Sequence, residues 1–312
     1  MKIPYKKIPV YYAVAVLFSF VFVSIFAPLI ANSRPLVYAD KGKIIFPALF
    51  DYSEYNNFDF KNAPGFKIFP PIKYNYSEYD LDSVVAPPSA DHYFGTDEQG
   101  RDIAARMIYG TRNSFIVSLI AVIIYLSIGI VAGSFAGYFG GIVDIILSRI
   151  IEVVICFPVL FFILALTAIF TPGLITIMVV IGLTGWTSTA RVVRGEFFKI
   201  KNSGYVLAAR AAGAGDFRII FRHILPNALP PVIVIAVFGL ASAVLIESSL
   251  SFLGFGVQPP SPSWGDILSQ SRDFFDFAWW LMFIPGGAIF AVISSYNILG
   301  RHLQNRYESN SR

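Results

Sequence analysis

The residues most able to do chemistry in this chain are charged groups in or beside long apolar stretches. Residues 95–102 read GTDEQGRD, and the two glycines have the spacing of a phosphate-binding loop. Arg101 stands where such a loop needs lysine, Asp102 stands where it needs a hydroxyl, and no apolar strand precedes the segment. A carboxylate there would repel phosphate. We interpret the segment as a turn and a helix start, with Asp102 in the first turn.

No other segment has the spacing of a phosphate-binding loop, so we expect this chain to hold no nucleotide or other cofactor. If ATP drives the protein, separate subunits must bind it. Cys156 is the only cysteine, which excludes an internal disulfide. The three histidines, His92, His223 and His302, are far apart in sequence, so we predict no metal site. No region combines a serine and a histidine or paired carboxylates, so we predict no catalytic residue.

Charges inside apolar stretches are costly and therefore informative. Asp144 begins one such stretch. Arg149 and Glu152 follow three residues apart, so they share a helix face and can pair. Glu247 lies about 20 residues into another stretch, with no cation nearby in sequence. Two interpretations of Glu247 stay open, namely pairing with another helix and lining a translocation path.

The elements that carry these charges are membrane spans. Of the 312 residues, 55% are hydrophobic and only 14% are charged, whereas soluble domains average about 25% charged residues. Spans must satisfy their own backbone hydrogen bonds, so an all-α polytopic membrane protein follows. Six stretches are long enough to cross a bilayer: 10–31, 114–137, 142–170 with a kink at Pro158, 174–186 with its flanks, 228–252 and 279–299. We expect Trp279 and Trp280 to anchor the last span at the interface.

The chain divides into four predicted parts. Residues 1–31 carry Lys2, Lys6 and Lys7 and an apolar run too long for a cleaved signal peptide. Residues 32–113 form a polar, aromatic-rich extracytoplasmic segment, in which we predict short strands at 43–46 and 66–69. Residues 114–300 hold five spans and a cytoplasmic loop at 187–227. Residues 301–312 form a cytoplasmic tail.

Charge sets the predicted topology. The formal net charge is +4, and we interpret the basic balance as a topology signal rather than a sign of nucleic-acid binding. Loop 187–227 and the tail are basic, whereas loop 256–278 is acidic, so we place both termini in the cytoplasm of a bacterial inner membrane. Arg101, Arg106 and Arg112 are exceptions on the outer side.

Small residues mark one helix face. Gly129, Gly133 and Gly137 recur every four residues in the second span, and Gly141 follows. Such residues let helix backbones approach closely. The face serves either packing within the chain or contact with a partner permease.

Residues 203–227, here called the coupling loop, read SGYVLAARAAGAGDFRIIFRHILPN. We predict a helix with Ser203 as its N-cap, ended by Gly213 and Gly215, and a second helix capped by Asp216. Tyr205, Val206, Ala209 and Ala212 are expected on one small apolar face. Small residues suit insertion into a protein groove better than contact with lipid.

The coupling loop resembles the Glu-Ala-Ala loop of binding-protein-dependent ABC importer permeases. The residues that match that motif are Ala208, Ala209, Gly213, Leu225 and Pro226. Leu207 replaces the glutamate and His223 the isoleucine. The resemblance extends over residues 91–300, and GTDEQGRD, YFGGIVD, HILPN and SLSFLGFGVQPPSPSWG resemble the second permease of the dipeptide/oligopeptide branch. The insertion at 32–90 resembles the subgroup for larger peptides and microcin C.

The resemblance implies six transmembrane helices, a coupling helix at about 202–214 and a peptide substrate. It implies as partners a second permease in a heterodimer, cytoplasmic ATPase subunits, an extracytoplasmic binding protein and membrane lipid, with no nucleic acid. The residues we expect at the ATPase contact are Gly204, Tyr205, Ala208, Ala209, Arg210, Gly213, Leu225 and Pro226. The alternative is a self-contained secondary transporter or channel, which would need coupling charges near the midplane or internal repeats.

Overall fold

The computed structural model describes residues 8–40, 43–50, 52, 55, 58–60, 62–170 and 173–310. The N-terminal lysines and Arg312 lie outside the described residues. The chain forms two compact units. Unit 1 comprises Met1–Ala15, Val117–Ile246 and Val292–Arg312, and unit 2 comprises Val16–Ile116 and Glu247–Ala291.

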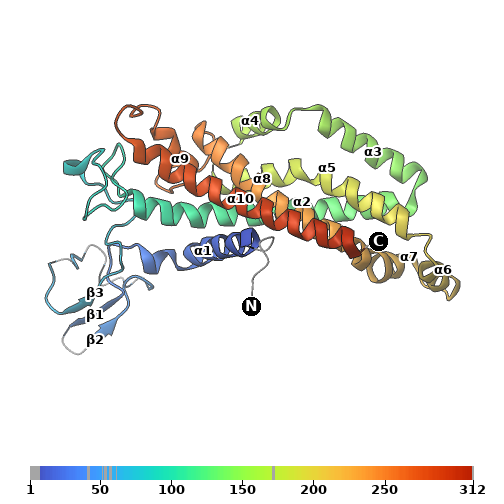
Figure 1. Cartoon of the computed structure of the whole chain (residues 1–312), viewed down its shortest axis with the longest axis horizontal. Helices are drawn as coiled ribbons and strands as arrows, with labels where there is room; N and C mark the ends of the chain where they lie inside the picture. The colour runs from blue at the N-terminus through green and yellow to red at the C-terminus, as the bar shows by residue number, and fades with distance from the viewer. Residues whose placement is uncertain are drawn as a thin grey trace. The chain divides into compact units, whose positions relative to one another are not determined.

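Helices dominate both units (Figure 1). They are α1 (Ile8–Ile30), η3 (Leu81–Ser83), α2 (Ile103–Phe139), α3 (Gly141–Cys156), α4 (Val159–Ile169), α5 (Leu174–Ile200), α6 (Gly204–Ala211), α7 (Asp216–Arg218), η4 (Ile219–Ile224), α8 (Leu225–Phe252), α9 (Trp264–Gln270) and α10 (Trp279–Asn310).

The predicted spans are present as helices. Five segments are long and apolar enough to cross a membrane: Ile8–Ile30, Ile103–Phe139, Leu174–Ile200, Asp216–Phe252 and Trp279–Ser309. The pair α3 and α4 is also long and apolar enough, but it is bent by 88° at a short break, as in a broken span or a re-entrant loop. Pro158 caps the start of α4, because its ring cannot continue α3 and it has no N–H to donate. The kink predicted at Pro158 is therefore confirmed.

Three helices continue beyond their apolar parts. α2 begins at Ile103 rather than at 114, α5 runs on to Ile200 through part of the predicted loop 187–227, and α10 ends at Asn310 rather than near 300. Hydropathy detects only the portion of a helix that lies in lipid. Polar extensions stay helical because their backbone hydrogen bonds continue and their charges find partners in the protein.

A small antiparallel sheet forms in the insertion of unit 2. β1 (Val37–Asp40) lies between β2 (Lys43–Ile45) and β3 (Phe66–Ile68). Tyr38 pairs with Ile45 and Lys67 and is buried, and its ring lies 5.4 Å from that of Phe60. The two predicted strands are confirmed, whereas the sequence interpretation missed β1.

The glycine face of α2 packs against α5 within unit 1. A Cβ added at Gly129 would lie 2.5 Å from the Thr189 Cβ, and one at Gly133 would lie 2.5 Å from the Ala190 carbonyl oxygen. Gly137 lies against Phe197 in the same way. The small-residue face therefore serves packing within the chain, and it lets α2 and α5 approach closely.

Candidate functional site

The coupling loop begins with α6, an eight-residue helix with a well-defined end. The N–H of Ala214 donates to the Ala209 carbonyl at 3.1 Å, and the N–H of Gly213 donates to that of Arg210 at 3.0 Å. These two bonds form a Schellman motif, which needs a left-handed residue after the C-cap. Gly213 supplies it, with φ of +81°. The helix end predicted at Gly213 is confirmed.

One residue of α6 anchors the helix to unit 1. Val206 is fully buried, in a cluster with Phe197 of α5 and with Ile219, Ile220 and Ile224 of η4. The neighbouring side chains face solvent instead, so Tyr205 is 47% exposed. Adjacent residues on a helix point about 100° apart. The prediction that Tyr205 and Val206 share one apolar face was therefore wrong.

A second anchor joins the coupling loop to α2. The Tyr138 hydroxyl donates to the Asp216 carboxylate at 2.6 Å, and the Arg210 guanidinium donates to the same hydroxyl oxygen at 3.4 Å. Gly215 holds the N-cap position of α7, so the prediction of Asp216 as a cap was wrong. Asp216 lies in the first turn and faces Tyr138. Ser203 does occupy the N-cap of α6, but its side chain makes no capping hydrogen bond.

The loop rejoins the membrane part of the chain through a π-helical turn. The N–H of Leu225 donates to the Ile220 carbonyl, five residues back. Pro226 follows directly in α8. Because the helical segment Asp216–Phe252 is continuous, the missing N–H of Pro226 leaves one bond of the helix unmade beside the π-helical turn. Leu225 packs partly buried against the Val206 cluster. The predicted Leu-Pro signal thus marks the start of α8.

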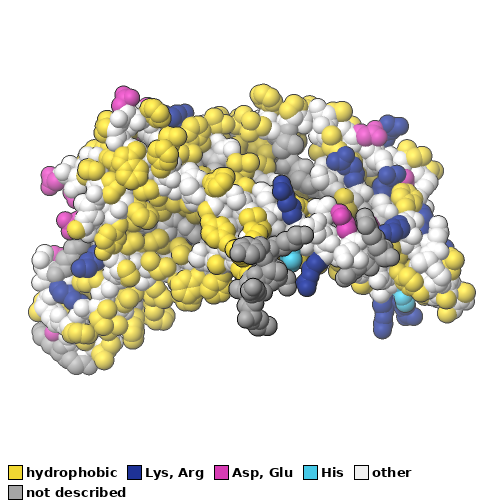
Figure 2. All heavy atoms as spheres, viewed as in Figure 1, with side chains coloured by type: hydrophobic (Ala, Val, Ile, Leu, Met, Phe, Trp, Pro, Cys, Tyr) yellow, Lys and Arg dark blue, Asp and Glu magenta, His cyan; other side chains and the backbone are white. Residues whose placement is uncertain are grey.

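Two ion pairs involve helices α3 and α5 of unit 1. The Arg194 guanidinium of α5 donates two hydrogen bonds to the Asp144 carboxylate of α3, one of them at 2.7 Å. Arg149 and Glu152 pair at 2.6 Å on the surface, as predicted. Figure 2 shows Lys and Arg side chains gathered over the part of unit 1 around the C-terminal end of α5. This end of unit 1 is therefore basic, and the Arg194–Asp144 ion pair joins α5 to α3.

A cavity of 520 Å³ lies within unit 1. Aromatic rings, among them Tyr125, Phe157 and Phe162, form much of its wall, with Ser242 and Arg191 as polar groups. The buried Tyr125 hydroxyl has no hydrogen-bond partner among the described residues, and it lies against Gly239, where any Cβ would overlap it. The cavity therefore offers mainly apolar surface, together with the unpaired Tyr125 hydroxyl. Glu247 is not among its lining residues.

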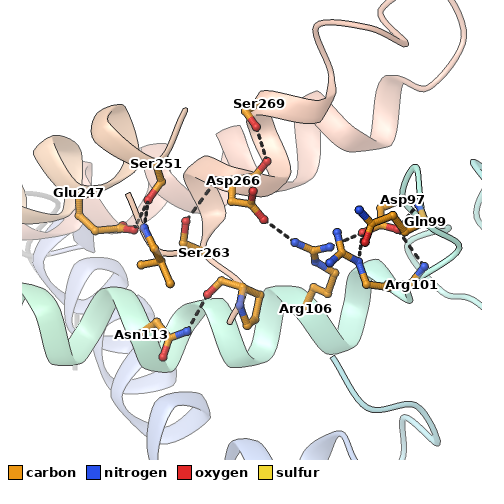
Figure 3. A network of polar contacts seen from close by, with 12 residues as sticks. Asp97, Gln99, Arg101, Arg106, Asn113, Glu247, Ser251, Ser263, Asp266 and Ser269 are labelled. Carbon is orange, nitrogen blue, oxygen red and sulfur yellow. Dashed lines mark hydrogen bonds and ion pairs between the residues drawn. The ribbon is translucent and has the colours of Figure 1, made fainter. Parts of the chain in front are cut away.

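Unit 2 contains a buried network of charges at the start of α2 (Figure 3). Asp97 accepts hydrogen bonds from the guanidinium groups of Arg101, at 2.7 Å, and Arg106. Arg106 also donates to Asp266 of α9. Asp97 is fully buried, and the two arginines are 2% or less exposed. Two of the three arginines that break the charge rule are thus neutralised inside the protein. The GTDEQGRD segment is a structural turn.

Asp102 caps α2 and contacts His92. Its carboxylate accepts from the Ala105 N–H at 2.7 Å and lies 2.9 Å from His92 Nδ1. It immediately precedes the helix rather than lying in the first turn. Burial raises the pKa of the Asp102 carboxyl, although the Ala105 and His92 hydrogen bonds lower it in part. Burial likewise raises the pKa of Asp266, against the lowering effect of Arg106.

Glu247 is fully buried in unit 2. Its carboxylate accepts hydrogen bonds from Ser251 at 2.9 Å and from Ser114 of α2 at 3.0 Å. No cation pairs with it among the described residues. Its partner on another helix is therefore a hydroxyl, and its role in a translocation path stays a prediction.

Trp280 is another residue whose surroundings differ from the prediction. It is 3% exposed, and its indole N–H donates to the Thr96 carbonyl at 3.1 Å. Trp279 is 55% exposed. The expected interfacial anchor was therefore wrong for Trp280, because its ring packs on the Gly95 turn, and it stays a prediction for Trp279.

Sequence reasoning missed the pairs Tyr138–Asp216, Arg194–Asp144 and Arg106–Asp266. Their members lie 78, 50 and 160 residues apart, so no local spacing marks them. The one available signal was the presence of Arg101 and Arg106 in a segment that the sequence analysis predicts on the outer side, where basic residues are rare. Buried arginines need carboxylate partners, so that anomaly pointed to an internal network.

Known proteins resemble this chain over most of its length. Residues 129–309 match the family described as binding-protein-dependent transport system inner membrane component. The dipeptide transport system permease protein DppC of Bacillus subtilis is 43% identical over 227 residues, covering 72% of this chain and 71% of the relative. The peptidoglycan transport system permease protein YejE of Agrobacterium fabrum is 34% identical over 299 residues, covering 83% of this chain and 78% of the relative.

A solved structure of the MetNI methionine ABC transporter, in an inward facing conformation, aligns with a TM-score of 0.54. The alignment covers 65% of this chain and 97% of the MetNI chain. The sequence identity is 18%, so the likeness shows the fold alone. The family match and the two relatives, at 43% and 34% identity, show the protein family as well as the fold. The chain therefore belongs to the family of binding-protein-dependent transport system inner membrane components, as the multi-pass permease subunit of an ABC importer.

Proposed function

We propose that this permease carries peptides and that its coupling loop docks on separate ATPase subunits, which bind the ATP. An importer of this family works in general with ATPase subunits, a partner permease and a binding protein. The proposal pairs this chain with a different second permease. It assigns α6 and both chain termini to the cytoplasm.

The main support for the ATPase contact is that one side of α6 is exposed while the other side is fixed to the rest of unit 1. The helix presents an exposed face that includes Tyr205 and Ala208, and small side chains at its end suit a groove in another protein. Its opposite side is fixed through Val206 and the Tyr138–Asp216 hydrogen bond. A displacement of α6 would therefore pass to α2 and α5 as a rigid-body movement rather than being absorbed by the loop.

Peptide cargo is supported by the relatives. The names of the two relatives above refer to dipeptide and peptidoglycan transport, and both cargoes contain peptide bonds. The cavity of unit 1 is consistent with such cargo, because it combines aromatic rings with the hydroxyls of Thr187, Ser188 and Ser242. These groups can meet apolar side chains and backbone amides together.

The ATPase contact is tested by Gly213→Val, with Gly215→Ala as the matched control. Valine is strained at φ of +81°, which costs roughly 1–3 kcal/mol. Gly215 has φ of −72° and open space around it, so alanine fits there. We expect Gly213→Val to reduce co-purification of the ATPase subunits and peptide-stimulated ATP hydrolysis in proteoliposomes, while Gly215→Ala retains both.

Two results would overturn the proposal. Full ATPase assembly in a Gly213→Val variant whose α6 is shown to be disordered would mean that the ATPase contacts another surface. Peptide uptake by proteoliposomes that contain this chain alone, without ATP, would instead favour a self-contained transporter. Uptake of labelled dipeptides and longer peptides, compared with free amino acids, tests the cargo class.

A further inference from the structure

We propose that the β-sheet of the insertion lies on the membrane surface, with one apolar face sunk into the lipid headgroup region. In the sheet, β2 and β3 each pair antiparallel with the central strand β1. The sheet belongs to unit 2, together with the part of α1 from Val16 to Ile30. This inference goes beyond the proposed function and uses no orientation of the chain, because either leaflet could receive the sheet.

One face of this sheet is apolar and exposed. Ala39 of β1 pairs with Ile44 of β2 and with Phe66 of β3, so these three side chains share a face. Ile68 lies two residues after Phe66 and therefore belongs to the same face, here called the apolar sheet face. Ile44 is 65% exposed, Phe66 64% and Ile68 45%. A cluster of large apolar side chains in water marks a protein or membrane contact.

The opposite face of the sheet is covered by the insertion itself. Tyr38 is buried there, and its ring lies 5.9 Å from that of Phe58 and 5.4 Å from that of Phe60. The Lys67 ammonium donates to the carbonyl oxygens of Phe60 and Ala63, both at 3.0 Å. The insertion therefore has its own small core on this side, and the apolar sheet face on the other side needs a different surface to bury it.

Backbone hydrogen bonds hold the sheet at the end of α1. The N–H of Ile72 donates to the Ile30 carbonyl at 3.1 Å, and the N–H of Asn32 donates to the Ile72 carbonyl at 3.1 Å. The N–H of Leu36 donates to the Ile68 carbonyl at 2.7 Å. An extended chain covers about 3.3 Å per residue, so the path from Ile68 to Ile72 spans at most about 13 Å. The apolar sheet face therefore stays close to the last turn of α1.

The length of α1 sets the level of the membrane. The helix has 23 residues and is about 34 Å long, whereas the hydrocarbon core of a bilayer is about 30 Å thick. The end of α1 at Ile30 therefore lies at the boundary between hydrocarbon and headgroups. Phe18, Phe22 and Ile25 are 71%, 47% and 61% exposed on one side of the helix, as lipid-facing residues are. Figure 2 shows hydrophobic side chains gathered over the insertion and the adjoining part of α1.

Lipid is the surface that the apolar sheet face meets at this level. Amphipathic surfaces on a membrane bury their apolar side about 5–10 Å into the boundary between headgroups and acyl chains. The exposed side of α1 meets lipid up to Ile30, and the apolar sheet face continues that surface. Lys73 is exposed directly after Ile72 and has no ion pair or hydrogen bond among the described residues, so its ammonium can reach lipid phosphates.

The test places a polarity-sensitive fluorescent probe on each side of β2. Ile44→Cys and Lys43→Cys are made in a Cys156→Ser background and labelled in the complete transporter in nanodiscs. The two positions are adjacent and exposed but point to opposite faces, so Lys43→Cys is the matched control. We expect phosphatidylcholine with a nitroxide near the head of its acyl chain to quench the probe at Ile44→Cys about twofold, because an inserted face lies about 5–10 Å deep. The probe at Lys43→Cys should keep its emission.

A second pair of variants tests the face with the probe on β3, at Phe66→Cys. Ile44→Glu puts a carboxylate on the apolar sheet face, where lipid would have to bury its charge, so it should abolish the quenching of this probe by nitroxide lipid. Lys43→Glu makes a larger change of charge on the opposite face and should leave the quenching unchanged. Size-exclusion chromatography of each variant shows whether the transporter stays assembled.

Three results would overturn the proposal. Equal quenching at Ile44→Cys and Lys43→Cys would mean that lipid does not select one face of the sheet. A blue-shifted probe at Ile44→Cys that nitroxide lipid does not quench would place the face against the partner permease. A probe at Ile44→Cys that aqueous iodide quenches until the binding protein is added would make the binding protein the occupant. Co-purification of the ATPase subunits, which tests the proposed function, is independent of all three results.

Discussion

The buried charge network of unit 2 makes a quantitative prediction for Asp97→Asn. Asparagine has the volume of aspartate, so the change removes charge without opening a cavity. The guanidinium of Arg101 would then have no carboxylate, and Arg106 would keep only Asp266. Breaking one partner of a buried ion pair costs about 3–5 kcal/mol, because an uncompensated charge stays buried.

The matched control is Glu152→Gln, which also removes a carboxylate from an arginine pair. Arg149 and Glu152 are 74% and 58% exposed at the side chain, so their pair contributes about 0–1 kcal/mol. At about 2 °C per kcal/mol, Asp97→Asn should lower the unfolding midpoint of the transporter by roughly 6–10 °C, and Glu152→Gln by less than about 2 °C. Thermal unfolding in nanodiscs, followed by size-exclusion chromatography of heated samples, measures both midpoints.

A second variant separates charge from shape. Asp97→Asn combined with Arg101→Met removes the cation that Asp97 alone compensates and leaves the Arg106–Asp266 pair. This double variant should recover part of the lost stability, since an apolar side chain of similar length can fill the same space. Equal midpoints for Asp97→Asn and Glu152→Gln would refute the reasoning, because burial would then make no difference to the cost of an unpaired arginine.

Three further predictions concern the membrane helices. Gly133→Ala should destabilise the α2–α5 contact by about 1–3 kcal/mol, whereas Gly195→Ala, with open space around it, should leave the unfolding midpoint unchanged. Tyr138→Phe removes the hydrogen bond between α2 and the coupling loop, so it should cost about 1 kcal/mol and lower the ratio of peptide uptake to ATP hydrolysis. Glu247→Gln should retain assembly, since its serine partners can reorient, and should change peptide uptake if the residue acts in translocation; unchanged uptake would exclude that role.

Much of the fold was predictable because the signals are local. The apolar stretches predicted the five segments that are long enough to cross a membrane and the bent α3–α4 pair, and Pro158 predicted the break between α3 and α4. Gly213 predicted the end of α6, because a left-handed residue is needed there and glycine supplies it most easily. The glycine spacing in α2 predicted a close helix contact, although the sequence left open whether α5 or another chain provides it.

The candidate site was predictable only in part. The coupling loop was located by its composition and spacing, but which side of α6 is buried was not. Val206 is fully buried because η4 folds back over it, and this contact joins residues from separate helices. The prediction that Tyr205 lies beside it failed because small residues on both sides of α6 left its apolar face ambiguous.

The sequence by itself determined the class of protein, the apolar segments that can cross a membrane and the position of the coupling loop. Those features depend on hydropathy and on residues within a few positions of one another. Only the tertiary structure decided the partners of the charges. Asp97, Arg106 and Asp266 meet because α9 packs against the start of α2, and Tyr138 meets Asp216 for a similar reason. Such contacts depend on how distant helices pack, a property of the whole fold that no local window of sequence contains.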